Sequence, residues 1–229
     1  MSRKQFCNNT VFKDYTSIPF KGVTPVKNYL VDYLPTWSPT WYVSFQVKPL
    51  YKVNKWTNVI RFTAGTQQNK KLGDSIPAVF FIPKTTRLLI CTGLGSNANK
   101  CYKTNPLPLE RWATVAIVQI QQGNKYFFTI NLNGKQLVLA ENKNPRYYPG
   151  VSIYRSDRFY GPAPAKIRSL KYKNLPGGKN EVYYFIHPFC CTLKDDHFKS
   201  TVKFGAQTQS SLYEDTYKTW YSEYRKLSF

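Results

Sequence analysis

Residues 187–197 hold the residue types best suited to metal binding or nucleophilic catalysis. Both histidines of the chain, two cysteines and two aspartates fall in this short segment. A zinc site would need four of these side chains to converge on a tetrahedron, and the adjacent Cys190 and Cys191 suit that geometry poorly. A catalytic thiol would need an oriented imidazole and an oxyanion-binding motif, and no such motif accompanies His187 or His197. We therefore predict no metal site here, but a structural thiol pair or a cystine that joins another segment.

Other catalytic and cofactor-binding patterns are incomplete. A glycosidase needs two carboxylates that face each other on neighbouring strands, whereas the strands expected between residues 111 and 140 have only Glu110 near one end. Gly93-Leu-Gly95 lacks a third glycine and a following helix, and Gly177-Gly-Lys179 lacks the spacing of a phosphate-binding loop. The sequence therefore predicts a protein that is not an enzyme and that needs no cofactor.

Basic and aromatic residues interleave in two segments. Lys143-Asn-Pro-Arg-Tyr-Tyr148 and Arg155-Ser-Asp-Arg-Phe-Tyr160 combine cations with flat rings, a combination suited to sulfated sugars or to stacked bases. The same rings could instead tuck under the edge of a sandwich and serve packing alone. With two lysines of a polar loop, these segments supply the predicted ligand-binding set: Lys70, Lys71, Lys143, Arg146, Tyr147, Tyr148, Arg155, Arg158 and Tyr160.

The net charge indicates an anionic partner. Lys and Arg total 33 against 12 Asp and Glu, which gives a formal charge of +21. Such a surface attracts polyanions, and nucleic acid, a sulfated glycan, an anionic membrane surface or a mineral-like polyanion would each satisfy it. The basic residues are spread along the chain rather than collected in an arm, so they could also serve solubility alone.

The elements that must position these residues are strands. Residues 111–120 form an apolar run rich in β-branched side chains, which predicts a strand buried on both faces. Residues 126–132 alternate, and Asn133-Gly134 then supplies the positive φ angles of a two-residue hairpin turn before the returning strand at 135–140. Further strands are expected at 41–47, 57–63, 76–82, 86–92, 150–155 and 165–172.

Cysteines and loops add further expectations. Residues 93–108 form a long surface loop rich in Asn and Gly, and Cys91 and Cys101 flank part of it and could close a hairpin. The count of five cysteines leaves at least one thiol unpaired, and the pairing stays open. No run is long enough for a transmembrane helix, and the first residues contain no apolar signal region. Either the chain is not secreted by the usual route, or a signal precedes it.

The two ends differ from the middle of the chain. Residues 1–40 contain four prolines and no periodicity, so we expect an extended N-terminal arm with one strand near 28–33. A sandwich is expected at 41–175 and a C-terminal extension at 176–229, which ends in an amphipathic helix with capping-box spacing at its start. This helix either docks on its own domain or packs on a neighbouring copy. Its aromatic stripe, the predicted assembly surface, is Tyr213, Tyr217, Trp220, Tyr224 and Leu227.

Seven segments form a pattern in this order: Trp41–Pro49, Asn58–Thr63, Gly73–Phe80, Arg111-Trp112, Phe128–Gly134, Val151–Asp157 and Ala165–Leu170. Together they resemble the concanavalin A-like lectin and laminin G-like sandwich superfamily over about residues 40–175. The resemblance implies a two-sheet antiparallel jelly roll that binds glycans or proteins, usually outside the cell. Members often bind calcium through clustered acids, but only Asp74 and Asp157 lie in suitable loops here, so no calcium site is carried over.

Two functional hypotheses follow. The first is an all-β, non-enzymatic jelly-roll sandwich that is extracellular, recognises a polyanionic glycan or matrix component, and could form a homo-oligomer through its arm and terminal helix. The second is a viral jelly-roll coat protein whose cations neutralise packaged nucleic acid. The absence of a concentrated basic arm counts against the second hypothesis, because nucleic acid in shells is usually neutralised by such a tail.

Overall fold

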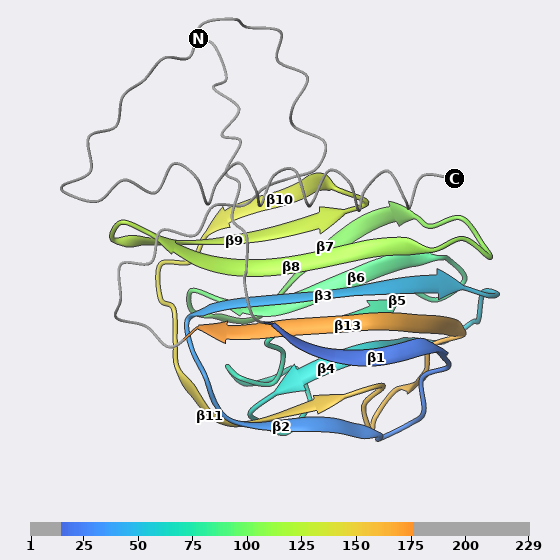
Figure 1. Ribbon diagram of the computed structural model, residues 1–229, viewed down its shortest axis with the longest axis horizontal. Helices are drawn as coiled ribbons and strands as arrows, with labels where there is room; N and C mark the ends of the chain where they lie inside the picture. The colour runs from blue at the N-terminus through green and yellow to red at the C-terminus, as the bar shows by residue number, and fades with distance from the viewer. Residues whose placement is uncertain (1–14, 176–229) are drawn as a thin grey trace, which may run out of the picture. The chain divides into compact units, whose positions relative to one another are not determined.

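A computed structural model describes residues 15–175, which form two β-sheets packed face to face (Figure 1). The first sheet has six strands in the spatial order β1 (Thr16–Val23), β13 (Ala165–Leu175), β3 (Thr40–Pro49), β8 (Ala113–Gln122), β9 (Lys125–Leu132) and β10 (Lys135–Glu141). The second has seven: in order β2 (Leu30–Trp37), β11 (Tyr148–Tyr154), β4 (Thr57–Thr63), β5 (Ala78–Phe81), β6 (Arg87–Leu94) and β7 (Asn97–Pro106), with the short β12 (Gly161–Pro162) beside β4.

The pairing of the strands confirms the predicted two-sheet antiparallel jelly-roll sandwich. Every strand pair among residues 15–175 is antiparallel except the two-residue bridge of β12 to β4. Residues 15–175 contain no helix, so no helix in this part of the chain could cross a membrane. The predicted helix at residues 211–227 and the cysteine-histidine segment at 187–197 lie outside the described residues.

An aromatic cluster joins the two sheets in the core. Trp37 and Phe62, both fully buried in the seven-stranded sheet, have ring centroids 5.3 Å apart. From the six-stranded sheet, Trp41 lies 5.8 Å from Trp37, and Tyr172 meets Phe62 edge-on at 5.8 Å. Burial of such large rings is a main source of stability. The clean alternation of Trp41-Tyr-Val-Ser-Phe-Gln-Val47 thus places its odd-numbered residues in the core, as predicted.

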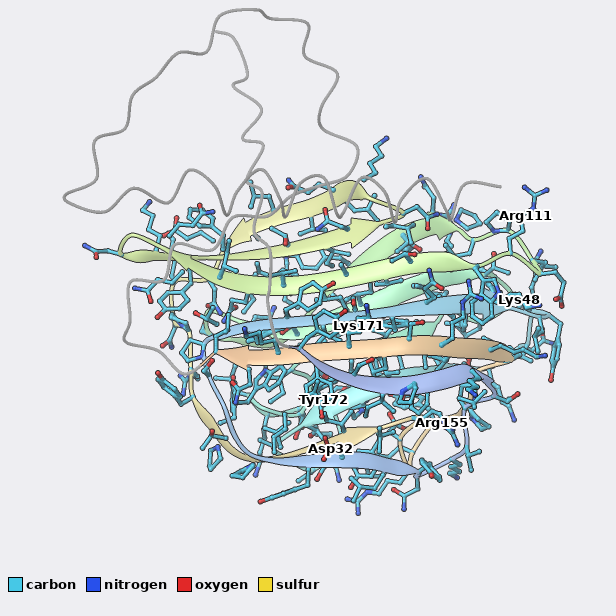
Figure 2. All side chains as sticks on the ribbon, viewed as in Figure 1. Asp32, Lys48, Arg111, Arg155, Lys171 and Tyr172 are labelled. Atoms are coloured by element: carbon cyan, nitrogen blue, oxygen red, sulfur yellow. A yellow bond between two sulfur atoms is a disulfide. The ribbon has the colours of Figure 1, made fainter. Side chains whose placement is uncertain are left out.

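Tyr172 also makes a polar link between the sheets. Its ring is buried in the core, and its hydroxyl donates a hydrogen bond to the carboxylate of Asp32 on β2 of the opposite sheet (Figure 2). Burial raises the pKa of the Tyr172 hydroxyl above its ordinary value, and the hydrogen bond to Asp32 raises it further. Asp32 is therefore engaged in holding β2 against β13.

The turns expected from the sequence are present. Asn133 and Gly134 have φ angles of 48° and 80°, the left-handed region required at both positions of the hairpin turn between β9 and β10. Cys91 and Cys101 face each other on β6 and β7 with Cα atoms 4.0 Å apart and form a disulfide. The sequence left the pairing of the cysteines open, and the structure pairs these two.

Two expectations about individual segments are corrected. Residues 93–108 were expected to be a loop, but residues 97–106 form β7, an edge strand whose exposed position explains its polar composition. The strand at 111–120 was expected to be buried on both faces. In β8, Ala113, Val115 and Ile117 are buried, whereas Thr114 is exposed and Ala116 half-buried. At its beginning this strand thus buries one face only.

The sandwich begins earlier than residue 41. β1 and β2, within the segment expected to be an extended arm, form one edge of each sheet, and β2 overlaps the single strand expected near residues 28–33. Pro19 and Pro35 lie in these strands and cannot donate to a ladder, which edge strands tolerate. β1 is also irregular, because its pairing with β13 shifts register twice between Ile18 and Val23.

Candidate functional site

The candidate site is built around Arg61, in the middle of β4. Phe62, the next residue, lies in the core, so Arg61 points to the outer face of the seven-stranded sheet. Two connections cover it there, residues 64–77 after β4 and residues 155–164 after β11. The guanidinium is therefore fully buried, with 0% of the residue exposed.

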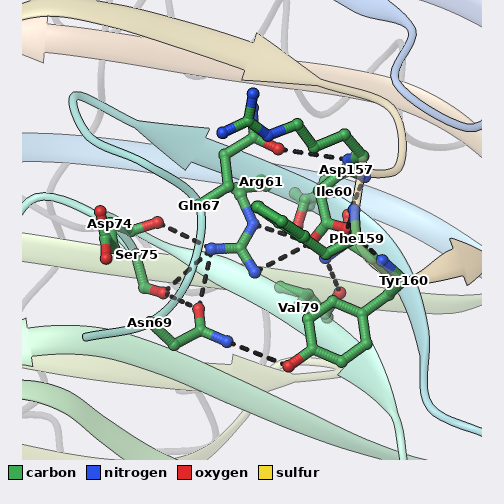
Figure 3. Close-up of polar contacts among 12 residues, drawn as sticks. Ile60, Arg61, Gln67, Asn69, Asp74, Ser75, Val79, Asp157, Phe159 and Tyr160 are labelled. Carbon is green, nitrogen blue, oxygen red and sulfur yellow. Dashed lines mark hydrogen bonds and ion pairs between the residues drawn. The ribbon is translucent and has the colours of Figure 1, made fainter. Parts of the chain in front are cut away.

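A network of oxygen atoms surrounds the Arg61 guanidinium (Figure 3). Its Nε and Nη2 each lie 2.9 Å from Oδ2 of Asp157, which is also fully buried. Its Nη1 donates to Oδ1 of Asn69 and to the backbone carbonyl of Asp74, both at 2.8 Å. Burial lowers the pKa of Arg61, and the adjacent Asp157 carboxylate opposes this effect.

Asp157 fixes the turn that follows it. Its second carboxylate oxygen accepts hydrogen bonds from the backbone N–H groups of Phe159 at 3.0 Å and Tyr160 at 2.7 Å. Its own backbone N–H donates to Oδ1 of Asn58, a buried residue of β4, at 2.9 Å. The ring of Tyr160 is consequently held over the outer face of the sheet.

Asp74 organises the other connection in the same way. Its carboxylate accepts backbone hydrogen bonds from Thr66 at 2.7 Å, Lys70 at 2.9 Å and Lys71 at 3.0 Å. Burial raises the pKa of Asp74, but these hydrogen bonds outweigh it and the net pKa is lowered. Gly65 permits the turn, because a β-carbon there would stand 2.2 Å from Oδ1 of Asp74. The side chains of Lys70 and Lys71 are left exposed.

Asp74 and Asp157, the two acids in loops suited to calcium binding, both have structural roles. Asp74 closes a loop by accepting backbone hydrogen bonds, and Asp157 neutralises Arg61. Within residues 15–175 no three His, Cys, Asp or Glu side chains lie close enough together to hold a metal ion. Both carboxylates are thus already engaged by the protein itself.

A shallow depression of about 120 Å³ opens on the outer face beside the two connections. It combines aromatic rings, two side-chain amides and the disulfide-bonded Cys91. We call it the outer-face depression, and it is lined by Trp56, Asn69, Phe80, Leu89, Cys91, Asn99 and Tyr160.

The rings and amides of the outer-face depression are held in defined positions. Tyr160 packs edge-on against Phe80 with ring centroids 5.1 Å apart, and the Asn69 amide lies 3.4 Å from the Tyr160 hydroxyl. Trp56, at the end of the connection from β3 to β4, is 41% exposed. A flat ring beside fixed amides can pack against an apolar face of a ligand and hydrogen-bond its hydroxyl groups.

Cations lie on the segments that carry the lining residues of this depression. The side chain of Lys55 runs along Gly161, with its Cε 3.6 Å from where a β-carbon would stand. Arg158 reaches the Thr66 carbonyl with Nη2 at 3.3 Å and covers the ring of Phe159 at 4.8 Å. Neither carboxylate of the site is available to neutralise them, because Asp74 and Asp157 are buried in the loops. These segments are therefore positively charged.

The structure brings part of the predicted ligand-binding set together. Lys70 and Lys71 lie on the first connection, and Arg158 and Tyr160 on the second. The hydrogen bonds from Asn69 to Tyr160 and from Arg158 to Thr66 join these two connections. Tyr160 lines the outer-face depression itself.

Arg155 is not part of this group. Its guanidinium lies 4.3 Å from the ring centroid of Tyr29 and 5.3 Å from that of Phe20. Its backbone N–H donates to the carbonyl of Tyr29 at 2.9 Å. Arg155 thus packs against the segment around β1 and β2.

Residues 143–148, the other segment in which basic and aromatic residues interleave, lead from β10 into β11. Lys143, Arg146 and Tyr147 are exposed there. Tyr148 is half-buried: its ring lies 3.2 Å from the β-carbon position of Gly73, and burial raises the pKa of its hydroxyl. Tyr148 therefore packs beside the first connection. Such packing is the alternative to ligand binding that the sequence left open for the rings of this segment.

Sequence reasoning missed Trp56, Asn69 and Asn99. A usable signal existed for Trp56, since Lys52-Val-Asn-Lys-Trp56 shows the same interleaving of cations and rings that singled out the two other segments. No comparable signal marks the amides. Asn69 and Asn99 approach Tyr160 and Cys91 only through the fold.

A larger cavity of about 260 Å³ lies between β7 of one sheet and the β9–β10 hairpin of the other. Core residues such as Ile90 and Ile130 form much of its wall, and Lys103 is the only cation that lines it. Its lining has one ring, Tyr102, and one side-chain amide, Asn105, whereas the smaller depression has three rings and two amides, so we place the candidate site at the outer-face depression.

No protein-family model matches the sequence, and no curated protein sequence matches it. Solved structures do match. The carbohydrate-binding module CBM40 of the Ruminococcus gnavus IT-sialidase, bound to α2,3-sialyllactose, has a TM-score of 0.52 at 11% identity, covering 73% of this chain and 95% of that one. A native heptameric SAP-like pentraxin from Limulus polyphemus has a TM-score of 0.44 at 17% identity, covering 70% and 77%. Botulinum neurotoxin type C has 0.39 at 13%, covering 60% of this chain and 33% of that one.

At these identities the likeness concerns the fold. The chain shares the two-sheet sandwich fold of the CBM40 module, the fold that the resemblance to concanavalin A-like lectins implied.

Proposed function

We propose that this chain is a non-enzymatic binding protein that recognises an anionic glycan at the outer-face depression. The observation that carries this proposal is the exposed ring of Trp56 beside Tyr160 and the amides of Asn69 and Asn99, with cations on the segments that carry these residues. Sites for small ligands typically combine apolar and aromatic walls with a few placed polar groups. A sugar ring offers a matching apolar face and hydroxyl groups around it.

The cations supply the preference for an anion. Lys55, Lys70 and Arg158 lie on the segments that surround the depression, and each can approach a carboxylate or sulfate on a bound sugar. The positive potential of the whole chain, with its formal charge of +21, speeds the encounter with such a ligand. The similar CBM40 module was solved with a sialylated sugar, which supports this class of ligand by analogy of fold alone.

The acids of the described residues support a binding role without catalysis. Glycoside hydrolysis needs two carboxyl groups on either side of the scissile bond. All five acids among residues 15–175 already have a partner in the protein: Asp32 with Tyr172, Asp74 with the Thr66–Lys71 backbone, Glu110 with Lys48, Glu141 with Lys125 and Asp157 with Arg61.

An extracellular location and self-assembly belong to the same proposal. The disulfide between Cys91 and Cys101 supports an oxidising compartment. Assembly through the stripe from Tyr213 to Leu227 rests on the sequence pattern, because these residues lie outside the described range. Packaging of nucleic acid remains the competing hypothesis, and the binding experiment includes it.

Trp56→Ala is expected to weaken glycan binding at least tenfold, which corresponds to about 1.4 kcal/mol. The protein is screened on an array of sialylated, sulfated and neutral oligosaccharides, with single-stranded DNA and RNA measured in parallel across salt concentrations. The best array ligand is then titrated against the wild type and the variant by calorimetry.

Tyr33→Ala provides the matched control. Tyr33 is 56% exposed and lies on β2, so its removal tests the loss of an exposed ring outside the site. We expect this variant to bind like the wild type. Equal weakening in both variants, or a preference for nucleic acid with a steep salt dependence, would contradict the proposal.

A further inference from the structure

A second charged surface lies on the opposite side of the sandwich. Along β13, Ile167, Leu170 and Tyr172 point into the core and are fully buried. The alternating residues point outward, and four of them are cations. With two lysines of neighbouring strands they form what we call the β13 basic face: Lys21, Lys48, Lys166, Arg168, Lys171 and Lys173.

The strand register brings the two additional lysines into this face. Lys21 of β1 lies opposite Arg168, and Lys48 of β3 lies opposite Lys166. The register of β13 shifts between Arg168 and Lys171. Lys166 and Arg168 lie on the outer face before this shift, and Lys171 and Lys173 lie on it after the shift. Figure 2 shows Lys48 toward one end of β3 and Lys171 further along β13. The face thus follows the length of the strand.

Aromatic rings hold several of these cations in place. The Arg168 guanidinium lies 4.2 Å from the ring centroid of Trp112, and the Lys48 ammonium lies 5.8 Å from the same ring. The Trp112 ring reaches across to β1, where it comes within 3.7 Å of the β-carbon position of Gly22. At the other end, Lys171 covers the ring of Tyr15 at 4.3 Å. These cations are therefore pre-positioned, and each of the two rings already has a cation over it.

Among residues 15–175, few acids lie near this face. Glu110 binds Lys48 at 3.1 Å at one end of it. The other acids among residues 15–175 are engaged elsewhere: Asp32 inside the sandwich, Asp74 and Asp157 under the loops of the other sheet, and Glu141 on β10 with Lys125. The outward cations of β13 consequently make a continuous positive strip.

We propose that the β13 basic face binds a linear anionic polysaccharide, independently of the outer-face depression. Alternate residues of a strand are about 7 Å apart, so Lys166 with Arg168, and Lys171 with Lys173, offer two pairs of spaced cations to an extended chain that bears sulfate or carboxylate groups. Single-stranded nucleic acid would gain most from stacking on free ring faces, whereas Trp112 and Tyr15 each already have a cation over the ring. With sites on opposite faces, one domain holds two glycan chains at once.

The test compares two triple variants of the full chain. Lys21→Gln/Lys166→Gln/Lys171→Gln removes three cations of the β13 basic face. The matched control Lys27→Gln/Lys84→Gln/Lys103→Gln removes three exposed cations outside it. Affinities for dextran sulfate, unmodified dextran and a single-stranded poly-dT are measured as a function of salt.

We expect the face variant to bind dextran sulfate at least tenfold more weakly and with a shallower salt dependence, while the control changes less than threefold. Unmodified dextran should not bind this face. The corresponding Lys→Arg triple variant keeps the charges and should keep the affinity, which separates loss of charge from misfolding. Trp56→Ala should also keep dextran sulfate binding, so failure of the depression and failure of this face are distinguishable.

Three results would overturn the inference. Equal loss in the face variant and the control would show that binding follows net charge alone. Unchanged affinity in the face variant would place the polyanion elsewhere. Tighter binding of poly-dT than of dextran sulfate, lost in the face variant, would make the surface a nucleic-acid site.

Discussion

Asp157→Ala is expected to lower the free energy of unfolding by about 3–5 kcal/mol, because it leaves the buried guanidinium of Arg61 without its counter-charge. Both side chains are fully buried and lie 2.9 Å apart. The substitution also removes the acceptor for the N–H groups of Phe159 and Tyr160. Urea denaturation of the wild type and the variant measures the difference.

An exposed ion pair supplies the control for this experiment. Lys48 and Glu110 lie 3.1 Å apart, but the Glu110 side chain is 61% exposed, so Glu110→Gln should cost less than about 1 kcal/mol. The double variant Arg61→Met/Asp157→Leu should recover part of the stability lost in Asp157→Ala, because it leaves no buried charge unpaired, although the N–H groups of Phe159 and Tyr160 still lack their acceptor. A cost for Asp157→Ala as small as that for Glu110→Gln would show that the two connections are not anchored through Arg61.

Removal of the disulfide is expected to have the second largest effect. Cys91→Ala/Cys101→Ala opens a link between residues ten positions apart, which should lower the free energy of unfolding by about 2–3 kcal/mol. The same variant should weaken glycan binding, because Cys91 lines the outer-face depression and Asn99 lies against the Cys101 sulfur at 3.6 Å. Urea denaturation and the calorimetric titration of the best array ligand measure the two effects.

Two outcomes distinguish this account from a purely local role of the disulfide. Wild type treated with reductant should show the same shift in its denaturation midpoint as the double variant. If the double variant keeps full stability, β6 and β7 are held together by their hydrogen bonds alone. If it loses stability but binds glycan normally, the depression does not depend on the position of Asn99.

Much of the sandwich follows from local sequence pattern. The alternation in Trp41–Val47 and the turn residues Asn133 and Gly134 indicate strands and hairpins directly, because period and positive φ are local properties. β1, β2 and β7 are harder to recognise. They are edge strands. Their prolines and polar residues do not fit the usual pattern of a strand, but they suit an edge position, which only the complete sheet defines.

The site is less accessible from sequence than the fold. Arg61 and Asp157 are 96 positions apart, and nothing in the strand pattern around Arg61 shows that loops cover its outer side. The interleaving of cations and rings found Tyr160 and Arg158, which lie at the site, but it equally selected Arg155, which stacks on Tyr29. Composition identifies the kind of residue, whereas pairing of distant segments determines which of them converge.

The most direct test of the central claim is a map of the glycan contact by NMR. The best array ligand is titrated into ¹⁵N-labelled protein, and chemical shifts of the side-chain N–H groups are followed. The account predicts that the Trp56 indole and the amides of Asn69 and Asn99 shift together with one affinity, and that Trp56→Ala abolishes the amide shifts. Shifts confined to residues 143–148, or none at these three side chains, would contradict it.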